Sequence, residues 1–478
     1  MKGSQLDYLI IIAYLIVIAA IGILSGGKQR TLKDYFHGSK PVAWWAVCFS
    51  MVAAETSTLT FISIPGLAYI TNLNFLQVTF GYLIGRIIVA FIFLPAYSRG
   101  ELRTAYTYLG ERFGQRTRSF ASIVFLFTRI AADGVRLFAT AIPLKLMIGI
   151  SYPEAIVIMA LVALLYTYTG GVRGIIWVDV VQMFIYLGGV LFAGLYLLSV
   201  LPGGWETAAA KASAAGKLSI FNSGFENGLS GFFSQPYTLI GGILGGAFLS
   251  MASHGTDQLI VQRLLATGSL KDGQKAIIGS GILVIIQFAV FLMMGILLYS
   301  YYGTLEIKPD TVFPKFIIEE LPPGIFGIII AGLFAAALST LAGSISSLSS
   351  STMMDLYLPF SKKSRSEKEK LMMSRIFSII AAFLLTGSAL FFINTSQAVV
   401  ELALSIASFT YGGLLGTFLL GIFVKKAGEK EALIGFSTGI IVMIFVISFK
   451  IVAWTWFTFA GVVATIAAGQ LLLLFRRK

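Results

Sequence analysis

This chain of 478 residues has very little cysteine, histidine or charge. It contains one cysteine, Cys48, and two histidines, and only 12% of its residues are charged. A single cysteine excludes a disulfide framework and any metal site built from cysteine ligands. The two histidines form no HExxH motif, and no spacing suggests paired aspartates or a serine with a histidine base at membrane depth. The composition therefore argues against a membrane-embedded enzyme.

Apolar residues are abundant instead, at 57% of the chain. About 20 consecutive apolar residues span the hydrocarbon core of a bilayer, and such stretches recur from end to end, so we predict an all-α polytopic membrane protein. Residues 1–478 are expected to form one transmembrane domain, with a Gly/Ser-rich surface loop at 202–235 as its longest connection. About thirteen spans are expected, at residues 7–25, 43–70, 74–98, 119–148, 153–170, 174–201, 236–254, 274–301, 323–352, 373–393, 397–424, 432–449 and 453–475.

The basic residues indicate how the chain is oriented in the bilayer. If the N-terminus lies outside, 25 Lys and Arg residues, Arg263 among them, fall on the inner side and six fall on the outer side. This split follows the positive-inside rule and accounts for the net charge of +13 without a nucleic-acid partner. The first span is kept as a helix because Asp7 precedes it and GGKQR anchors it inside, unlike a signal peptide. The compact loops favour a bacterial inner membrane, with the C-terminus in the cytoplasm.

Polar residues interrupt two of the expected spans. The first interruption lies in SMVAAETSTLTFISIPG (50–66), and the second, five spans later, in GGAFLSMASHGTDQ (245–258). Interrupted helices at matching positions of two halves predict an inverted-repeat transporter, in which half-helix ends and free carbonyls can hold ions or solute. The expected parts are an extra N-terminal helix (7–25), a first five-helix repeat (43–201), a second repeat (236–424) and two C-terminal helices (432–475).

The expected span 323–352 is unusually rich in serine. Ala336, Ser339 and Thr340 are spaced i, i+3 and i+4, which places them on one helical face. Na⁺ is a hard cation and takes oxygen ligands, so this face could offer one carbonyl and two hydroxyls, with further carbonyls from the interruption near Ala53 and Thr56. The alternative is that the small residues only let helices pack closely.

Several stretches resemble the sodium/solute symporter family, similar to its sodium/sugar and sialic acid symporters. The resemblance covers nearly the whole chain and implies a LeuT-type core of two inverted five-helix repeats, a Na⁺ gradient as the driving force, and alternating access. The stretches that carry it are DYFHGSKPVAWWAVCFSMVAAETSTLTF (34–61), YTGGVRGIIWVDVVQ (168–182), GTDQLIVQR (255–263), GLFAAALSTLAGSISSLSS (332–350) and YGGLLGTFLLGIFVKKAG (411–428).

The resemblance also implies where Na⁺ binds. The ligands would be the carbonyls of Ala53, Thr56 and Ala336 and the hydroxyls of Ser339 and Thr340. A second sodium site of some relatives needs hydroxyls two and three residues beyond Thr340 and an acidic partner. Here those positions hold Ala342 and Gly343, and only Asp179 remains. We therefore expect one coupled Na⁺, with Asp179 supporting the fold or the first site through hydrogen bonds.

Three charged residues lie on one face of the expected span 119–148. Arg129, Asp133 and Arg136 follow at i, i+4 and i+7, and charges inside a membrane usually serve function. One reading is a structural ladder in which Asp133 bridges both arginines and leaves one positive charge. The other is that this spare charge binds a solute carboxylate, which arginine grips bidentately. The resemblance places the carboxylate-binding arginine of sialic acid symporters at Ala132, which argues against sialate and leaves another anionic solute open.

Further solute contacts are expected at the two interruptions and beside them. Glu55 could bind an ammonium group or sugar hydroxyls, or pair with a neighbouring cation, and His254 is either a hydrogen-bonded core residue or a contact in the second interruption. Ser57 and Thr60 match positions that touch substrate in the sialic acid relatives. The full set of expected solute-binding residues is Glu55, Ser57, Thr60, Phe75, Thr79, Arg129, Ala132, Arg136, Ser253 and His254.

The leading hypothesis is a Na⁺-coupled symporter that imports a small organic solute, carboxylate-bearing or sugar-like, in a lipid bilayer. The main alternative is a proton-coupled symporter of the same fold, with Glu55, Asp133, Asp179 or His254 as the proton carrier. A transporter-like sensor is disfavoured because the chain ends at FRRK with no signalling domain. The sequence leaves open the identity of the solute, the affinity and the oligomeric state, a monomer included.

Overall fold

A computed structural model describes residues 3–97, 104–226, 228–394 and 399–476, and every regular element in these ranges is a helix. Four short elements are π- or 3-10-helical: η1 (Val89–Phe93), η2 (Thr352–Tyr357), η3 (Phe392–Asn394) and η4 (Trp454–Trp456). The α-helices are α1 (Gln5–Gly26), α2 (Leu32–His37), α3 (Trp44–Glu55), α4 (Thr58–Ile70), α5 (Leu76–Ile88), α6 (Leu94–Tyr97), α7 (Ala105–Phe113), α8 (Gln115–Ile148), α9 (Tyr152–Val200), α10 (Gly204–Ala214), α11 (Gly228–Ser234), α12 (Leu239–Gly255), α13 (Gln258–Leu265), α14 (Leu270–Tyr302), α15 (Pro309–Glu319), α16 (Ile325–Ser351), α17 (Leu358–Phe360), α18 (Glu367–Phe391), α19 (Val399–Phe423), α20 (Glu429–Ser448) and α21 (Phe457–Arg476).

Many of these helices are long and apolar enough to cross a membrane. Within the described ranges nine qualify, and the bent pair α3 and α4 makes ten. The expected spans 153–170 and 174–201 both lie in α9, which is two helical segments separated at Gly171, where the backbone leaves the helical conformation (φ 57°, ψ −162°). Helix α8 is not among the nine, and α19 enters only as the shorter apolar helix Phe409–Phe423. The polytopic architecture is confirmed, although fewer than thirteen helices meet this measure.

Both expected interruptions are present, and they share their local chemistry. Helix α3 ends at Glu55 with Thr56 as its C-cap, and α4 begins after Ser57, with a bend of 69° between them. Helix α12 ends at Gly255 with Thr256 as its C-cap, and α13 begins after Asp257. Each threonine hydroxyl donates back to the carbonyl four residues earlier, and each following residue caps the next helix. Thr–Ser and Thr–Asp thus end one helix and start another, because short polar side chains compete with backbone hydrogen bonds.

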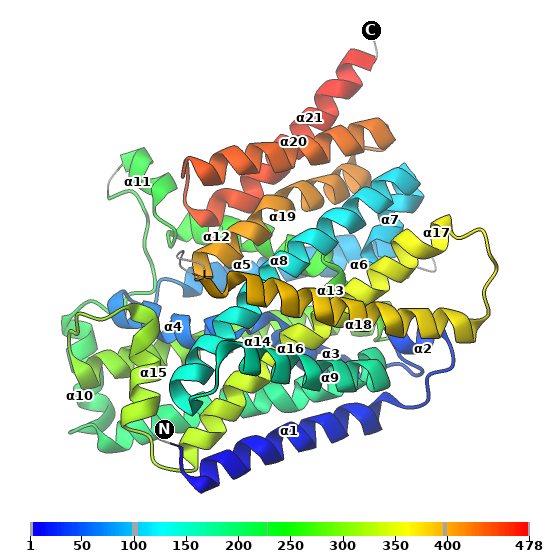
Figure 1. Ribbon diagram of the computed structural model, residues 1–478. Helices are drawn as coiled ribbons and strands as arrows, with labels where there is room; N and C mark the ends of the chain where they lie inside the picture. Colours follow the sequence, from blue (N-terminus) through cyan, green and yellow to red (C-terminus); the bar gives the residue numbers. More distant parts are fainter. Residues whose placement is uncertain (1–2, 98–103, 227, 395–398, 477–478) are drawn as a thin grey trace.

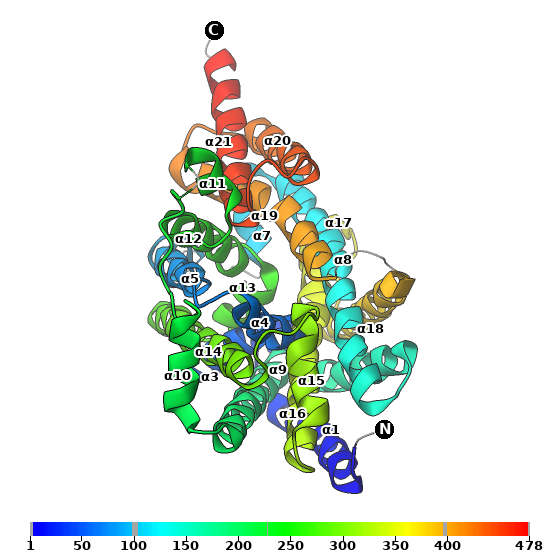
Figure 2. The ribbon, with the colours of Figure 1, turned by 90° about the vertical axis from the view of Figure 1, so that its left-hand side faces the viewer.

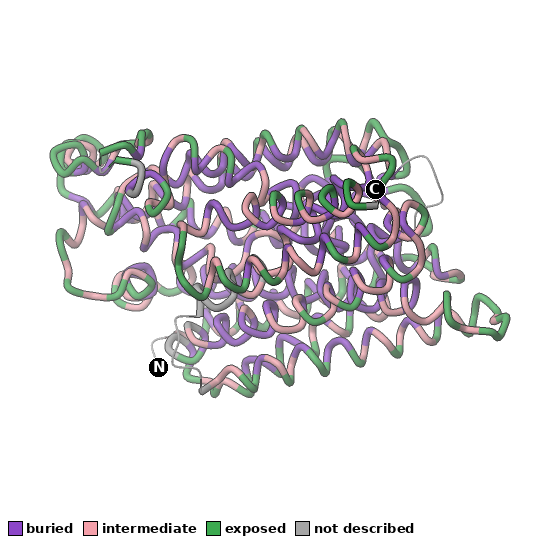
Figure 3. The backbone as a smooth tube through the Cα atoms, turned by 90° about the horizontal axis from the view of Figure 1, so that it is seen from above, coloured by how far each residue is buried: buried purple, intermediate pink, exposed green. Residues whose placement is uncertain are grey.

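The serine-rich helix α16 lies at the centre of the bundle. Of its most apolar stretch 89% is buried, and it packs against α1, α3, α8, α9 and α18. Seen from above, the buried backbone gathers in the interior (Figure 3). The hydroxyls of α16 therefore face protein rather than lipid, as the scarcity of hydrogen-bond partners in hydrocarbon requires.

The terminal helices lie at opposite edges of the bundle. Figure 1 shows α1 along one edge and α20 and α21 along the other, and Figure 2 shows the same order from the side. Helix α1 packs against α9 and α16, whereas α20 and α21 pack against α19 and each other. This arrangement agrees with one extra N-terminal and two extra C-terminal helices around a central core.

Glycines allow α1 and α9 to approach closely. A Cβ atom added at Gly170 would lie 2.2 Å from the carbonyl oxygen of Gly22, and one at Gly26 would lie 2.3 Å from the Cα of Gly170. Small residues at four-residue spacing are the usual means by which membrane helices pack backbone to backbone. Gly170 and Gly26 thus fix the position of α1 on the bundle.

The expected surface loop 202–235 contains helical structure. It contains α10 and α11, and Lys217 extends from it to the end of α4. The Lys217 ammonium donates to the carbonyls of Tyr69 (2.6 Å) and Thr71 (3.1 Å) and lies 4.3 Å from the centre of the Tyr299 ring. A lysine at the carbonyl end of a helix satisfies orphan acceptors and complements the helix dipole, so Lys217 caps the C-terminal end of α4.

We predict that Gly170→Ala destabilises the protein and that Gly188→Ala does not. The added methyl group at position 170 meets the backbone of α1, and overpacking of this kind typically costs about 1–3 kcal/mol. Gly188 lies on the same helix, and a Cβ there would meet nothing within 4 Å. Thermal unfolding of the purified variants measures the difference, and equal melting temperatures would contradict the packing described here.

Candidate functional site

The broken end of α3 and the central helix α16 meet at the expected sodium ligands. The Thr340 hydroxyl donates to the carbonyl of Ala54 (3.4 Å) and to that of Ala336 (3.2 Å). The last carbonyls of a helix have no partner within that helix, so the carbonyls of Ala53 and Ala54 at the end of α3 are available to other groups. The end of α3 and the helix α16, almost 300 residues apart in sequence, thus bring oxygen atoms close to one another.

The Thr56 side chain is held by the protein itself. Its hydroxyl donates to the carbonyl of Val52 (2.8 Å) and accepts from Gln287 Nε2 (2.6 Å) and the Tyr186 hydroxyl (3.2 Å). These contacts occupy the side chain and fix the backbone at the break. The group that Thr56 can offer to an ion is therefore its carbonyl, in line with the expected role.

Ser339 is oriented by Asp179. The Ser339 hydroxyl donates to Asp179 Oδ1 (2.6 Å), and Asp179 Oδ2 accepts from the Ser50 hydroxyl (2.5 Å) and from Arg263 Nη2 (3.0 Å). Because Ser339 gives its proton to the carboxylate, its oxygen keeps lone pairs free for a cation. Asp179 thus hydrogen-bonds to Ser339, and its role as a support of the sodium site stays a prediction.

The expectation that Arg263 lies in an inward loop is wrong. Its side chain is 3% exposed and belongs to α13, in the protein interior. A positively charged residue close to the end of an apolar segment looks like a topology signal in the sequence. Here the helix break at Asp257 turns the chain so that Arg263 faces inward to a carboxylate.

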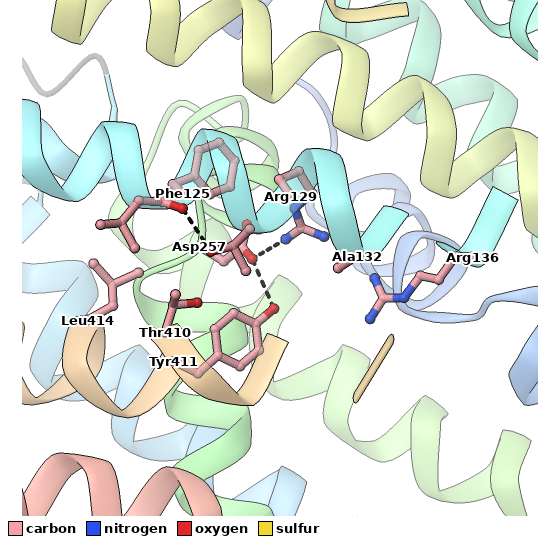
Figure 4. A pocket seen from close by; sticks show the side chains of 10 residues that line it. Phe125, Arg129, Ala132, Arg136, Asp257, Thr410, Tyr411 and Leu414 are labelled. Carbon is pink, nitrogen blue, oxygen red and sulfur yellow. Dashed lines mark hydrogen bonds and ion pairs between the residues drawn. The ribbon is translucent and has the colours of Figure 1, made fainter. Parts of the chain in front are cut away.

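The intramembrane ladder is present, but it carries a second carboxylate. Asp133 contacts Arg129 (3.3 Å) and Arg136 (2.9 Å), as the spacing predicts. Arg129 also pairs with Asp257, the cap of α13, which accepts from the Tyr411 hydroxyl (3.0 Å). Figure 4 shows Arg129 from α8 and Tyr411 from α19 converging on Asp257. Two arginines and two aspartates balance each other, so the expectation of one spare positive charge is wrong.

Arg136 lines two small pockets. One is lined by Arg136, Ser57 and the expected sodium ligands Ala336 and Thr340, among others. The other is lined by Arg136, Arg129 and Ala132, among others. The Arg136 side chain is 26% exposed and contacts Asp133 through Nη1. A guanidinium carries five N–H donors, so Arg136 can still bind an anion beside the sodium ligands.

Glu55 pairs with a cation that the sequence analysis did not predict. Its carboxylate contacts Arg86 of α5, which is fully buried and donates to the Ser280 hydroxyl (2.8 Å). His254 Nε2 lies 3.6 Å from the same carboxylate, and His254 Nδ1 lies 2.8 Å from the Ser253 hydroxyl. Of the roles considered for Glu55, the ion pair is therefore the one present. The sequence does contain a signal for this pair, because Arg86 is a charged residue inside the apolar run LIGRIIVAF.

The remaining expected solute residues fall into two groups. Ser57 caps α4, and its hydroxyl lies 3.4 Å from that of Thr60. Phe75 is stacked on Phe288 with ring centres 5.0 Å apart, and the buried Thr79 hydroxyl donates to a carbonyl of its own helix. Phe75 and Thr79 line neither of the two pockets described above, and their role as solute contacts stays a prediction.

We predict that Glu55→Gln lowers the stability of the protein strongly. Removing one partner of a buried ion pair leaves the other charge unpaired and typically costs about 3–5 kcal/mol. Glu319→Gln is the matched control, because Glu319 also pairs with a basic residue, Lys315, but at the surface, where such pairs contribute little. Thermal unfolding distinguishes the two, and similar melting temperatures would show that the Arg86 pair carries no structural role.

Comparisons with known proteins give a consistent result. The model of the sodium:solute symporter family matches residues 35–439. A sodium/sialic acid symporter of Proteus mirabilis is 29% identical over 92% of this chain and 89% of its own length. The human sodium-coupled monocarboxylate transporter 1 is also 29% identical, over 92% of this chain and 73% of its own length.

Solved structures of similar proteins point to the same family and show the fold. The substrate-bound, outward-open structure of a Na⁺-coupled sialic acid symporter superposes with a TM-score of 0.89 at 28% identity, covering 98% of this chain and 97% of that one. Mhp1, a nucleobase-cation-symport-1 family transporter, shares the fold with a TM-score of 0.60 at 12% identity, covering 92% of this chain and 93% of its own. The expected LeuT-type fold is confirmed, and the chain belongs to the sodium:solute symporter family, whose members are secondary transporters.

Proposed function

We propose that this symporter couples the entry of Na⁺ to the uptake of a small organic anion, whose carboxylate binds Arg136 beside the sodium site. The observation that carries the proposal is one pocket lined by both Arg136 and the sodium-site residues Ala336 and Thr340. A solute in this pocket would touch the helix face that holds the ion. Each ligand would then raise the affinity for the other, since coupling between two sites is reciprocal.

The similar proteins support a carboxylate-bearing solute. Two of them are a sodium/sialic acid symporter and a sodium-coupled monocarboxylate transporter, and both kinds of solute carry a carboxylate. A sodium/glucose cotransporter of Oryctolagus cuniculus, 26% identical, is also among the relatives, so a neutral sugar is the competing solute. The partly exposed guanidinium of Arg136 favours the anion.

The solute's charge decides how transport responds to membrane potential. Movement of one Na⁺ through 100 mV releases about 2.3 kcal/mol. A monoanion that enters with one Na⁺ carries the opposite charge, so the membrane potential supplies no net energy. Only the two concentration gradients then drive uptake. A neutral sugar entering with one Na⁺ would instead be driven by the potential as well.

The contacts of the acidic residues favour Na⁺ over a proton as the coupled ion. Three candidate proton carriers, Glu55, Asp133 and Asp179, each have an arginine partner. Protonating Glu55 or Asp179 would leave a buried arginine without its counter-charge, and protonating Asp133 would leave an excess positive charge beside Arg129 and Arg136, which is costly. The oxygen atoms at the broken end of α3 and on α16 are the ligands that a hard cation prefers.

We further propose that the domain consists of two inverted repeats, residues 43–201 and 236–424, oriented in a bacterial inner membrane with the N-terminus outside. The distribution of Lys and Arg between the loops supports this orientation. Cys48, the only cysteine, is buried, so single-cysteine variants can be made in a Cys48→Ser background.

In that background, a membrane-impermeant maleimide should label Ser213→Cys in intact cells and Ser364→Cys only after the cells are opened. Both serines are exposed, and the proposed orientation places residue 213 outside and residue 364 inside. The reverse pattern would show that the orientation is wrong, and labelling of both in opened cells controls for reactivity.

We predict that a carboxylate solute raises the melting temperature of the purified protein only when Na⁺ is present. A ligand that binds the folded state alone stabilises it by mass action. The screen compares sialic acids, monocarboxylates, amino acids and sugars in Na⁺ and in K⁺. Arg136→Gln should abolish the shift, whereas Arg116→Gln, an exposed arginine on the same helix, should retain it.

Two outcomes of this screen would contradict the proposal. A neutral sugar that gives the shift while no carboxylate does would show that Arg136 does not select the solute. Equal shifts in Na⁺ and K⁺ would show that the solute site does not depend on Na⁺.

A further inference from the structure

Four phenylalanines lie in the segment between α10 and α12, and three of them are exposed. The exposed fractions of Phe221, Phe225 and Phe233 are 66%, 51% and 43%, whereas Phe232 is buried. From Phe221 to Phe233 the sequence contains one charged residue, Glu226. Exposed apolar patches mark surfaces that bind another protein or a membrane. These four residues, the phenylalanine segment, therefore form a surface that suits a partner less polar than water.

The protein holds the backbone of the phenylalanine segment in one place. The backbone N–H of Leu239 donates to the carbonyl of Asn222 (2.7 Å), and that of Asn222 donates to Oε1 of the buried Gln77 (3.2 Å). The rings of Phe225 and Phe232 are stacked with their centres 4.8 Å apart. The exposed rings thus belong to a packed structure that presents them outward.

The segment is attached to the turn between α20 and α21. The backbone N–H of Ala453 donates to the carbonyl of Phe233 (2.8 Å). The ring centre of Trp456 lies 5.3 Å from that of Phe233 and 5.5 Å from that of Phe232. Figures 1 and 2 both show α11 at the edge of the molecule where α20 and α21 lie. The phenylalanine segment therefore lies at the periphery of the bundle.

Helix α20 indicates the level of this turn in the membrane. It has 20 residues, and a helix of this length spans about 30 Å, the thickness of the hydrocarbon core. Its C-terminal end therefore lies near the boundary between hydrocarbon and headgroups. Ile441 and Phe445 are exposed on α20, and the exposed side chains of Phe449 and Ile451 continue this apolar surface past the end of the helix. The lipid-facing surface thus extends from α20 to the turn that binds Phe233.

We propose that the phenylalanine segment inserts into the boundary region of the bilayer and anchors this loop of the transporter there. Aromatic rings concentrate at the membrane–water boundary, and an apolar face binds there by burying its side chains. The partner is lipid, and in the proposed orientation it is the lipid of the outer leaflet. Because the segment has no Lys or Arg, burial of the rings drives insertion, and attraction to anionic headgroups does not.

The anchored loop is also joined to the broken helix. The backbone N–H of Leu73, in the turn between α4 and α5, donates to the carbonyl of Ser219 (3.1 Å). Two residues earlier in the loop, Lys217 caps the C-terminal end of α4. The anchor therefore connects the bilayer surface to the end of α4, the second half of the helix whose break forms the candidate sodium site.

Spin labels on single cysteines test the depth of the segment. The variants are made in a Cys48→Ser background and placed in nanodiscs of uncharged phospholipid. A label at Phe225→Cys should be reached by molecular oxygen, which concentrates in lipid, several-fold more readily than by a water-soluble nickel complex. Phe221→Cys, at the most exposed ring of the segment, repeats the measurement at a second position.

Two control positions set the scale. Ser213 is exposed on α10, outside the phenylalanine segment, and a label at Ser213→Cys should be reached more readily by nickel. Ile441 is exposed on the lipid-facing surface of α20, and a label at Ile441→Cys should favour oxygen. The measurement is the same whichever side of the protein lies outside the cell, so it is independent of the maleimide test of orientation.

Three outcomes would overturn the proposal. Labels at positions 221 and 225 that nickel reaches as readily as the label at position 213 would show that the rings face water. Labels reached by neither reagent would show that protein, such as a second copy of the chain, covers this surface. Protection from nickel only in nanodiscs that contain anionic lipid would show that charge attraction, and not burial of the rings, holds the segment at the membrane.

Discussion

The contact between the broken end of α3 and the central helix α16 is the constraint on which the rest of the structure depends. Hydrocarbon offers no partners for hydroxyls or free carbonyls, so both must face each other inside the protein. The hydrogen bond from Thr340 to Ala54 joins them directly. The burial of α16 follows from this, and so does the placement of α1, α8 and α9 around it. What results is a set of hard oxygen atoms in the protein interior.

Charge is balanced pair by pair around this centre. The pairs are Arg86 with Glu55, Arg129 with Asp257, Arg136 with Asp133 and Arg263 with Asp179. The pairs of Arg86 and Arg129 connect the two helix breaks to neighbouring helices, whereas the pair of Arg136 with Asp133 lies within α8. Arg136 differs from the others because 26% of its side chain is exposed, against at most 8% for the other three arginines. The pairs thus hold the scaffold, while one guanidinium remains accessible to a solute.

Much of this site follows from local sequence, and the rest does not. Helical spacing predicts the face formed by Ala336, Ser339 and Thr340 and the contacts of Asp133, because residues three and four apart lie together on a helix. Polar runs in apolar segments predict both breaks. By contrast, Arg86 lies 31 residues from Glu55, Arg263 lies 84 from Asp179 and Asp257 lies 128 from Arg129. Only the packing of separate helices determines such pairs, which is why the sequence suggested a spare charge that does not exist.

The most direct test of the sodium site is Na⁺ binding by Ser339→Ala compared with Ser347→Ala. Both serines are fully buried on α16, but the Ser347 hydroxyl donates to a carbonyl of its own helix. Binding of radioactive Na⁺ to the purified proteins should be lost or strongly weakened in Ser339→Ala and unchanged in Ser347→Ala. Equal binding by the two variants would show that Na⁺ does not bind between α3 and α16.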